Sequence, residues 1–234
     1  MQGSAENNGS DIKRQNVEAA YALLCEVGME GASAREIARR MGTTAPAVYR
    51  HFKSLDHLLA LASVRFLMPY YENLEALAPT CANSLDVNIQ GWECFAYYAF
   101  QNVAVFENLF FGNHSDGMDP INEYYELFPE EKAQIKDYLT QPTSSVDMRE
   151  RDLYMLNRAV GEGYIRSEDV EYLADCDLLI LRGMFQQYRN EKTDAASAHK
   201  IARLFLRLVY RNYTRCLLSG KRIMEGLSGR YAFV

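Results

Sequence analysis

One short stretch, TTAPAVYRHFKSLDHLL from Thr43 to Leu59, concentrates side chains that could bind a charged partner. If Thr44–Lys53 forms a helix, Val48 and Phe52 lie four residues apart and face inward. The opposite, solvent-facing side then carries Pro46, Tyr49, Arg50 and Lys53. Arginine can pair bidentately with guanine in the DNA major groove, and lysine, tyrosine and histidine can hold phosphates. The pattern predicts a DNA-reading helix, although a solvated polar face on a helical hairpin explains it equally well.

The residues around this stretch predict the helices that would position it. A first helix is expected over about Ser10–Val27, because apolar residues recur there at helical spacing and Gly28 can end it. Ser33-Ala-Arg-Glu36 matches a capping box, so a second helix follows and stops at Gly42. A third helix begins near Thr44, and Ser54 caps a fourth. Two short helices joined by a tight turn form a helix-turn-helix, whose second helix reads bases.

The remaining sequence is also predicted to be helical. Residues 85–111 are apolar nearly all round, which is typical of a helix buried on every side. Two long apolar helices are expected at about 168–188 and 195–218, and no stretch alternates with the period of a strand. The predicted fold class is therefore all-α. A flexible tail (1–9) precedes a three-helix helix-turn-helix domain (10–60) and a larger helical domain (61–234).

Composition narrows the class of protein. The chain has 234 residues and a net charge of −6, yet five basic residues and one acid lie between Arg35 and Lys53. No apolar run approaches the roughly 20 residues that span a bilayer, and the N-terminus lacks the apolar core of a signal peptide. The five cysteines are scattered without a CxxC pair, and the four histidines are equally dispersed. We therefore expect a cytoplasmic protein without a disulfide framework, a metal site, a cofactor or a membrane partner.

The segment AREIARRMGTTAPAVYRHFKSLDHLL resembles the DNA-binding domain of the tetracycline-repressor (TetR) family of bacterial transcription regulators. The family pattern is a helix ending in glycine, a short recognition helix carrying tyrosine, then Phe-Lys-Ser/Asn and a capped fourth helix. The clear match covers roughly Val17–Leu61. The resemblance implies that several residues contact double-stranded DNA, namely Arg35, Thr44, Pro46, Tyr49, Arg50, His51 and Lys53. The family often has a lysine after Ser54, whereas this chain has Leu55, which puts one phosphate contact in doubt.

In that family the second domain builds a ligand pocket and a dimer interface. Aromatic walls with a few hydroxyl groups suit a mostly apolar pocket for a small-molecule effector. The candidate pocket residues are Trp92, Phe95, Tyr98, Phe106, Tyr124, Tyr125, Tyr154, Phe185 and Tyr188. The alternative is that these aromatic residues form the core, which aromatic stripes at helical spacing usually do.

The last two predicted helices carry more apolar surface than one small domain needs to bury. The apolar residues concerned are Leu173, Leu181, Met184, Phe185, Ile201, Phe205, Leu208 and Val209. Together with the resemblance, this surface predicts a homodimer held by these helices. Asp177 interrupts the apolar stripe, and it either faces solvent at its edge or fixes the pairing through a polar contact.

The sequence favours a regulator over an enzyme. A helical carboxylate-metal oxidase needs paired Glu-x-x-His units, and the sequence contains none, nor a phosphate loop, a nucleophile elbow or a catalytic cysteine context. The expected function is a repressor released from a palindromic operator by a small, largely apolar ligand. The alternative is a helical small-molecule-binding or interaction protein that does not bind DNA.

Overall fold

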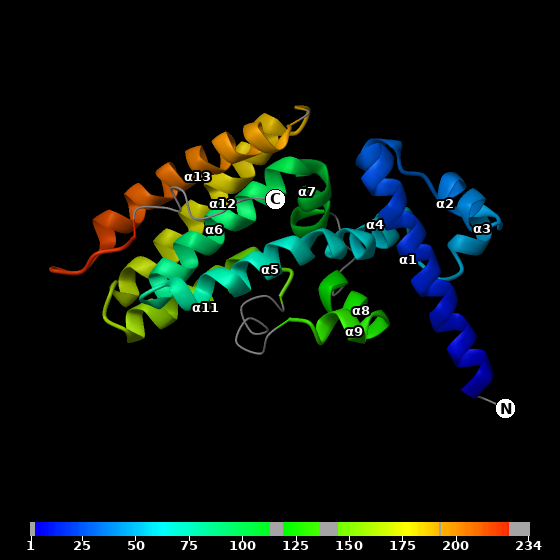
Figure 1. Ribbon diagram of the computed structural model, residues 1–234, viewed down its shortest axis with the longest axis horizontal. Coiled ribbons are helices and arrows are strands. Elements are labelled where there is room, and N and C mark those ends of the chain that lie inside the picture. The colour runs from blue at the N-terminus through cyan, green and yellow to red at the C-terminus, as the bar shows by residue number, and fades with distance from the viewer. Residues whose placement is uncertain (1–2, 113–118, 136–144, 192, 225–234) are drawn as a thin grey trace. The chain divides into compact units, whose positions relative to one another are not determined.

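The computed structural model describes residues 3–112, 119–135, 145–191 and 193–224, and all the regular structure within these ranges is helical (Figure 1). The predicted all-α class is confirmed. None of the helices in these ranges is both long and apolar enough to cross a membrane. The chain divides into two compact units: unit 1 is Met1–Met68 with Ala104–Lys136, and unit 2 is Pro69–Val103 with Asp137–Val234.

Unit 1 begins with a long helix followed by three shorter ones. The first helix starts at Gly3, not near Ser10, so most of the expected flexible tail is helical. Gly28 has φ 70° and ψ −175°, which interrupts the helix where the sequence predicted its end. The helices of unit 1 are α1 (Gly3–Gly31), α2 (Ala34–Arg40), α3 (Ala45–Val48), α4 (Leu55–Val64), η1 (Arg65–Leu67), α7 (Val103–Phe111), α8 (Pro120–Leu127) and α9 (Pro129–Lys132).

Residues 104–136 were expected in the second domain but cluster with the helix-turn-helix instead. The helix α8 packs against α4 and α1. Arg14 on α1 donates to the carbonyl of Leu127 at 2.6 Å, and its guanidinium lies 4.5 Å from the ring centre of Phe128. Arg65 lies over the Tyr21 ring and pairs with Glu131 at 3.4 Å. These side chains join segments far apart in the sequence, which is why local patterns placed the boundary at residue 60.

Unit 2 is built around α6, whose buried residues occupy nearly every position along the helix. The helix α6 packs against α13 and α11, and α12 packs against both α11 and α13 (Figure 1). Phe100 on α6 meets Phe185 on α12 edge to face at 5.5 Å. The helices of unit 2 are α5 (Met68–Leu77), η2 (Ala78–Thr80), α6 (Ser84–Gln101), α11 (Met148–Gly161), η3 (Ser167–Asp169), α12 (Val170–Tyr188) and α13 (Ala195–Cys216).

The single buried helix predicted over residues 85–111 is two helices. Asn102 has φ −142° and ψ 53°, so it ends α6, and α7 begins at Val103. The carbonyl of Phe100, near this break, accepts a hydrogen bond from the hydroxyl of Thr193. Continuous apolar composition does not reveal such a break, because both helices bury their residues.

Candidate functional site

The turn between α2 and α3 has the local geometry of a helix-turn-helix. Ser33 caps α2 by accepting a hydrogen bond from the Glu36 backbone N–H at 3.2 Å. The Glu36 carboxylate does not complete the capping box, because it binds the Arg39 guanidinium at 2.7 and 2.9 Å instead. Gly42 ends the turn with φ +64°, a left-handed conformation that glycine adopts without steric cost.

The recognition element is shorter than the sequence predicted. The α-helix α3 comprises only Ala45–Val48, with Pro46 in its first turn, and Tyr49 is its C-cap residue. The backbone N–H of Arg50 then donates to the Ala47 carbonyl at 3.3 Å, and that of His51 to Val48 at 3.1 Å. These bonds span three residues, as in a 3₁₀ turn. The expected continuous helix to Lys53 is therefore a short α-helix followed by a tighter turn.

Burial nevertheless follows the predicted division into two faces. Val48 is 2% exposed and Phe52 is 3% exposed, whereas Tyr49 is 48% exposed. Among the other candidate DNA-contacting residues, His51 is half-buried and the rest are exposed. The surface formed by α2, α3 and the following turn, called here the basic surface, exposes Arg35, Thr44, Pro46, Tyr49, Arg50 and Lys53.

The arginines of unit 1 differ in whether they have acidic partners. Arg39 pairs with Glu36, and Arg40 pairs with Glu26 at 2.5 Å and with Glu36 at 3.4 Å. These partners, Arg39 first, lower the pKa of the Glu36 carboxyl to about 2. Within the described ranges, the side chains of Arg35, Arg50 and Lys53 make no hydrogen bond or ion pair. Their charges are therefore available to an external anion.

A buried histidine anchors the segment that follows the recognition turn. Ser54 caps α4 by accepting from the backbone N–H of His57, and the backbone N–H of Lys53 donates to His57 Nδ1 at 3.2 Å. Since Nδ1 accepts, Nε2 carries the proton and donates to the Glu123 carboxylate at 2.9 Å. This arrangement ties the backbone of Lys53 to α8 within unit 1. Leu55 is the first residue of α4 and is half-buried.

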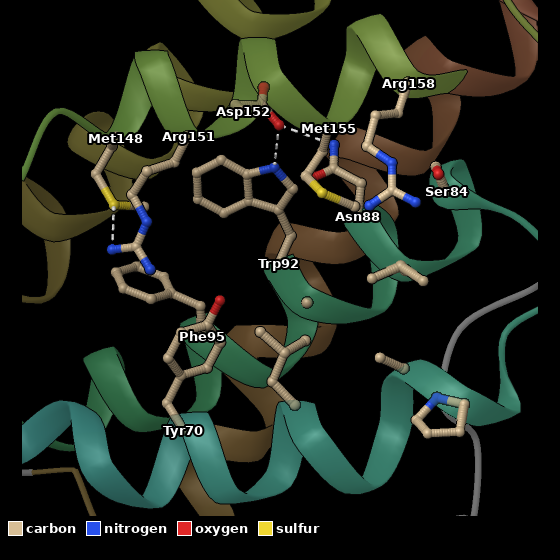
Figure 2. Close-up of a pocket in the computed structure, with 15 residues that line it drawn as sticks. Tyr70, Ser84, Asn88, Trp92, Phe95, Met148, Arg151, Asp152, Met155 and Arg158 are labelled. Carbon is tan, nitrogen blue, oxygen red and sulfur yellow. Dashed lines mark hydrogen bonds between the residues drawn. The ribbon is translucent and has the colours of Figure 1, made fainter. Parts of the chain in front are cut away.

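Unit 2 contains a cavity of about 380 Å³ between α5, α6 and α11 (Figure 2). Its size lies within the usual range for small-molecule sites. The wall is mainly apolar and aromatic, with a few amide, carboxyl and guanidinium groups. The lining residues are Tyr70, Leu74, Ala78, Pro79, Ser84, Val87, Asn88, Gly91, Trp92, Phe95, Met148, Arg151, Asp152, Met155 and Arg158.

Two of the nine candidate pocket residues, Trp92 and Phe95, line this cavity. The others do not, and three of them belong to unit 1, namely Phe106, Tyr124 and Tyr125. Tyr124 is core, because its ring stacks on Phe128 at 4.6 Å and its hydroxyl donates to Glu131 at 2.6 Å. In unit 2, Phe185 and Tyr188 pack on Phe100, Tyr98 accepts a hydrogen bond from Asn73, and Tyr154 is half-buried outside the cavity.

The sequence reasoning missed the contribution of α11 to this cavity. Met148, Arg151, Asp152, Met155 and Arg158 recur at helical spacing along one side of that helix. Arg151 and Asp152 are nonetheless buried. Two adjacent ionisable residues on the inward side of a predicted helix are the signal that could have indicated a functional wall.

A buried polar network borders the cavity. Asp152 Oδ1 accepts from Trp92 Nε1 at 2.9 Å and from Asn88 Nδ2 at 2.8 Å (Figure 2). The Tyr213 hydroxyl accepts from Asn88 at 2.9 Å and donates to Asp177 Oδ2 at 2.6 Å. The network joins α6, α11, α12 and α13. Asp177 is fully buried, so its polar contacts lie inside the unit and it does not face solvent.

Burial raises the pKa of both carboxyl groups of this network. Burial raises the pKa of Asp152 to about 6, against the effect of Asn88 and Trp92, and burial together with Asp152 raises the pKa of Asp177 well above its ordinary value. Asp152 Oδ2 and Asp177 Oδ1 are buried without a donor in the described part of the chain, although the two side chains interact. One proton shared by these oxygens would satisfy both, and two adjacent carboxylates do not both ionise cheaply.

Each of the two units carries one candidate binding site. Unit 1 is a helix-turn-helix with unpaired cations on its exposed surface, and unit 2 is a helical body with an apolar cavity. The described residues contain no cluster of His, Cys, Asp or Glu placed to hold a metal ion.

Comparison with known proteins shows which sequences the helix-turn-helix segment resembles. Residues 17–62 match the sequence model of "Bacterial regulatory proteins, tetR family". HTH-type transcriptional regulator PksA of Bacillus subtilis (strain 168) is 31% identical over 113 residues, which are 41% of this chain and 55% of PksA. The chain thus spans about half the length of that relative. The helix-turn-helix segment of the chain is therefore similar to that of tetR-family bacterial regulatory proteins.

Two solved structures align with most of the chain. RolR in complex with resorcinol has a TM-score of 0.58 at 12% identity, covering 94% of this chain and 98% of RolR. PfmR from Thermus thermophilus has a TM-score of 0.49 at 23% identity, covering 84% of this chain and 97% of PfmR. The likeness to RolR shows that the two chains share a helical fold, and at this identity it shows the fold alone.

Proposed function

We propose that this chain is a transcriptional repressor that binds a palindromic DNA operator as a homodimer and is released by a small, largely apolar ligand. In this role it is not an enzyme, and it works in the cytoplasm. The observation that carries the proposal is the pairing of charges in unit 1. Arg39 and Arg40 are neutralised by Glu36 and Glu26, whereas Arg50, Arg35 and Lys53 expose unpaired charges on the basic surface. Unpaired cations beside a helix-turn-helix suit the phosphate backbone and base edges of DNA.

The test is selection from a random duplex pool, followed by substitution of the two cations after α3. We expect the selected sequences to be palindromic, with half-sites about one DNA turn apart, roughly 34–36 Å, or a little more. Arg50→Ala should weaken the free energy of operator binding by about 1–3 kcal/mol and relax specificity at one position in each half-site, because bidentate pairing to a base is lost. Lys53→Ala should weaken binding to all DNA sequences alike and reduce the slope of log affinity against log salt concentration by about 1.

Lys132→Ala is the matched control, because it removes an exposed positive charge of unit 1 from α9, outside the basic surface. It should leave operator affinity within twofold of the parent. A chain that enriches no sequence is the alternative, a ligand-binding or interaction protein without DNA binding. Uniform weakening by Arg50→Ala would show that this arginine holds phosphate instead of reading a base.

The helices α12 and α13 expose less apolar surface for a homodimer interface than the sequence suggested. Seven of the eight residues expected at the interface are buried within unit 2, and only Leu208 is exposed. Other exposed apolar side chains do lie on the two helices, with Leu179 70% and Tyr172 49% exposed on α12. These residues and Leu208 on α13 are the surface that we assign to the partner copy.

Leu179→Glu is therefore expected to convert a dimer into a monomer without unfolding unit 2. The glutamate side chain is solvated in the monomer, and only association would bury its charge without a partner. Sedimentation velocity at micromolar concentration measures the change, and Asn157→Glu on the exposed side of α11 is the control. A parent chain that sediments only as a monomer, with and without DNA, would refute the dimer.

The cavity in unit 2 supports the ligand half of the proposal. Its aromatic and aliphatic wall with few polar groups is typical of sites for small, mostly apolar molecules. RolR, whose fold this chain shares, has been solved with the ligand resorcinol. A hundredfold loss of DNA affinity needs a coupling free energy of only about 2.7 kcal/mol between the two sites. Because coupling is reciprocal, bound DNA must lower the affinity for the ligand by the same factor.

A further inference from the structure

The cavity of unit 2 carries a positive charge at each end. Arg151 and Arg158 both come from α11 and are seven residues apart, which corresponds to about 10.5 Å along the helix axis. Figure 2 shows Arg158 beside Asn88 and Ser84, and Arg151 at the opposite end beside Phe95 and Met148. Trp92 lies between the two. The apolar wall is therefore bounded by guanidinium groups.

The two arginines differ in their contacts. Arg151 is buried, donates weakly to the Met148 sulfur at 3.9 Å and interacts with the Tyr70 hydroxyl. Arg158 is exposed at its end of the cavity, and its guanidinium makes no hydrogen bond or ion pair with any residue that the structure describes. Of these two groups, Arg158 is thus the one available to a ligand.

The acidic groups nearby are already satisfied. Glu162 accepts hydrogen bonds from the backbone N–H of Ser84 at 2.8 Å and from its hydroxyl at 2.5 Å. Asp152 Oδ1 accepts from Trp92 and Asn88. Glu162 and Asp152 thus already accept hydrogen bonds from the protein, whereas the Arg158 guanidinium has no such partner among the described residues. Arg158 is therefore the group of the cavity wall that an anion can neutralise.

We propose that the effector is an organic monocarboxylate whose carboxylate pairs with Arg158 and whose apolar body lies along Met155, Leu74 and Trp92 toward Phe95. This inference rests on the proposed role of unit 2 as the ligand-binding unit. A guanidinium can hold a carboxylate through two parallel hydrogen bonds, which neither an alcohol nor an ammonium group can form. The length between the two ends suits an extended alkyl chain of medium length or a compact ring system.

The chain contains an optical probe for this cavity, because Trp92 is its single tryptophan. Fluorescence titration of the full chain without DNA should compare decanoate with decanol and decylamine, and cyclohexylacetate with cyclohexylethanol. We expect at least one carboxylate to saturate the signal and to bind about ten- to a hundredfold more tightly than its alcohol, as for a charge-assisted hydrogen bond. The amine should bind most weakly.

Arg158→Gln should remove most of the preference for carboxylate over alcohol while changing alcohol binding less than twofold. Arg158→Lys should retain part of it. Arg166→Gln is the matched control, because it removes an exposed positive charge of unit 2 that pairs with Glu168 and does not line the cavity. The inference is overturned if neither carboxylate saturates, if an alcohol binds as tightly as its carboxylate, or if Arg158→Gln leaves the preference unchanged.

The two proposals fail separately. A carboxylate that binds through Arg158 in a chain that selects no DNA sequence would refute the regulator and leave the ligand class standing. A chain that selects a palindrome yet binds no carboxylate would refute the ligand class alone.

Discussion

Phe52→Ala is expected to lower the free energy of unfolding of unit 1 by about 3–5 kcal/mol and to abolish DNA binding with it. Phe52 is 3% exposed, and its ring meets the buried His57 ring edge-on at 5.8 Å. Truncating a buried phenylalanine removes its transfer free energy and leaves a cavity. The loss also removes the packing that holds the recognition turn beside α4. Thermal unfolding followed by far-ultraviolet circular dichroism measures the change.

Tyr49→Ala is the matched control for this substitution. Tyr49 is an aromatic residue three positions earlier, but it is half exposed and belongs to the basic surface. Its removal should change stability by no more than about 0.5 kcal/mol, as for most surface substitutions, while still weakening DNA binding. Equal destabilisation by the two changes would contradict the assignment of Tyr49 to the solvent side and Phe52 to the core.

Asp177→Ala should destabilise unit 2 by about 2–4 kcal/mol, whereas Asp177→Asn should retain the fold and be the more stable of the two at every pH. The alanine leaves the buried O–H of Tyr213 without an acceptor and a cavity beside Asp152, and an unmade buried hydrogen bond carries the desolvation cost of its donor. The asparagine can accept from Tyr213 with its oxygen and donate to Asp152 with its amide nitrogen. It thereby replaces the protonated carboxyl of the parent.

The pH dependence gives a second measurement of the same pair. Burial raises the pKa of Asp152 to about 6 in the folded chain, against about 3.9 for an unperturbed aspartate. The folded state therefore keeps a proton that the unfolded state has released, and the stability this supplies is present below about pH 4 and lost as pH rises through about 6. The raised pKa of Asp177 adds to the same decline, so Asp177→Asn should make it shallower by removing one of the two titrating carboxyls, while the part due to Asp152 remains.

Chemical denaturation monitored by Trp92 fluorescence at pH 5 and pH 8 separates these outcomes, since Trp92 donates directly to Asp152. The matched control is Asp175→Asn, an exposed aspartate two residues away that pairs with Arg149. It should not alter the slope between the two pH values. An Asp177→Asn chain as unstable as Asp177→Ala at pH 8 would show that the two carboxyls do not share a proton.

The cavity network gives the polar wall of unit 2 a structural role beyond ligand contact. Asp152 lines the cavity, and through Asp177 it reaches Tyr213 on α13. A displacement of α11 would therefore disturb hydrogen bonds on both α12 and α13. These are the helices whose exposed leucines we assign to the dimer interface, so both proposals depend on the same group of helices.

Some features of this protein were readable from local sequence alone. Ser33 and Ser54 cap their helices because a hydroxyl accepts from a backbone N–H three residues later, and Gly42 allows the left-handed turn. The inward direction of Val48 and Phe52 follows from their spacing. Such interactions span only a few residues, so the sequence predicted the position of the helix-turn-helix and which side chains it exposes.

Only the tertiary structure decided which residues form the cavity and where the units divide. Tyr124 and Trp92 are both aromatic residues in apolar helices, yet one fills the core of unit 1 and the other lines the cavity of unit 2. Their periodicity is the same, because a core and a cavity wall both need an inward apolar side. The contributions of Arg151, Asp152 and Arg158 depend on contacts with α5 and α6, which are distant in the sequence. Packing between distant helices, which local spacing does not encode, places these charged groups against the aromatic wall.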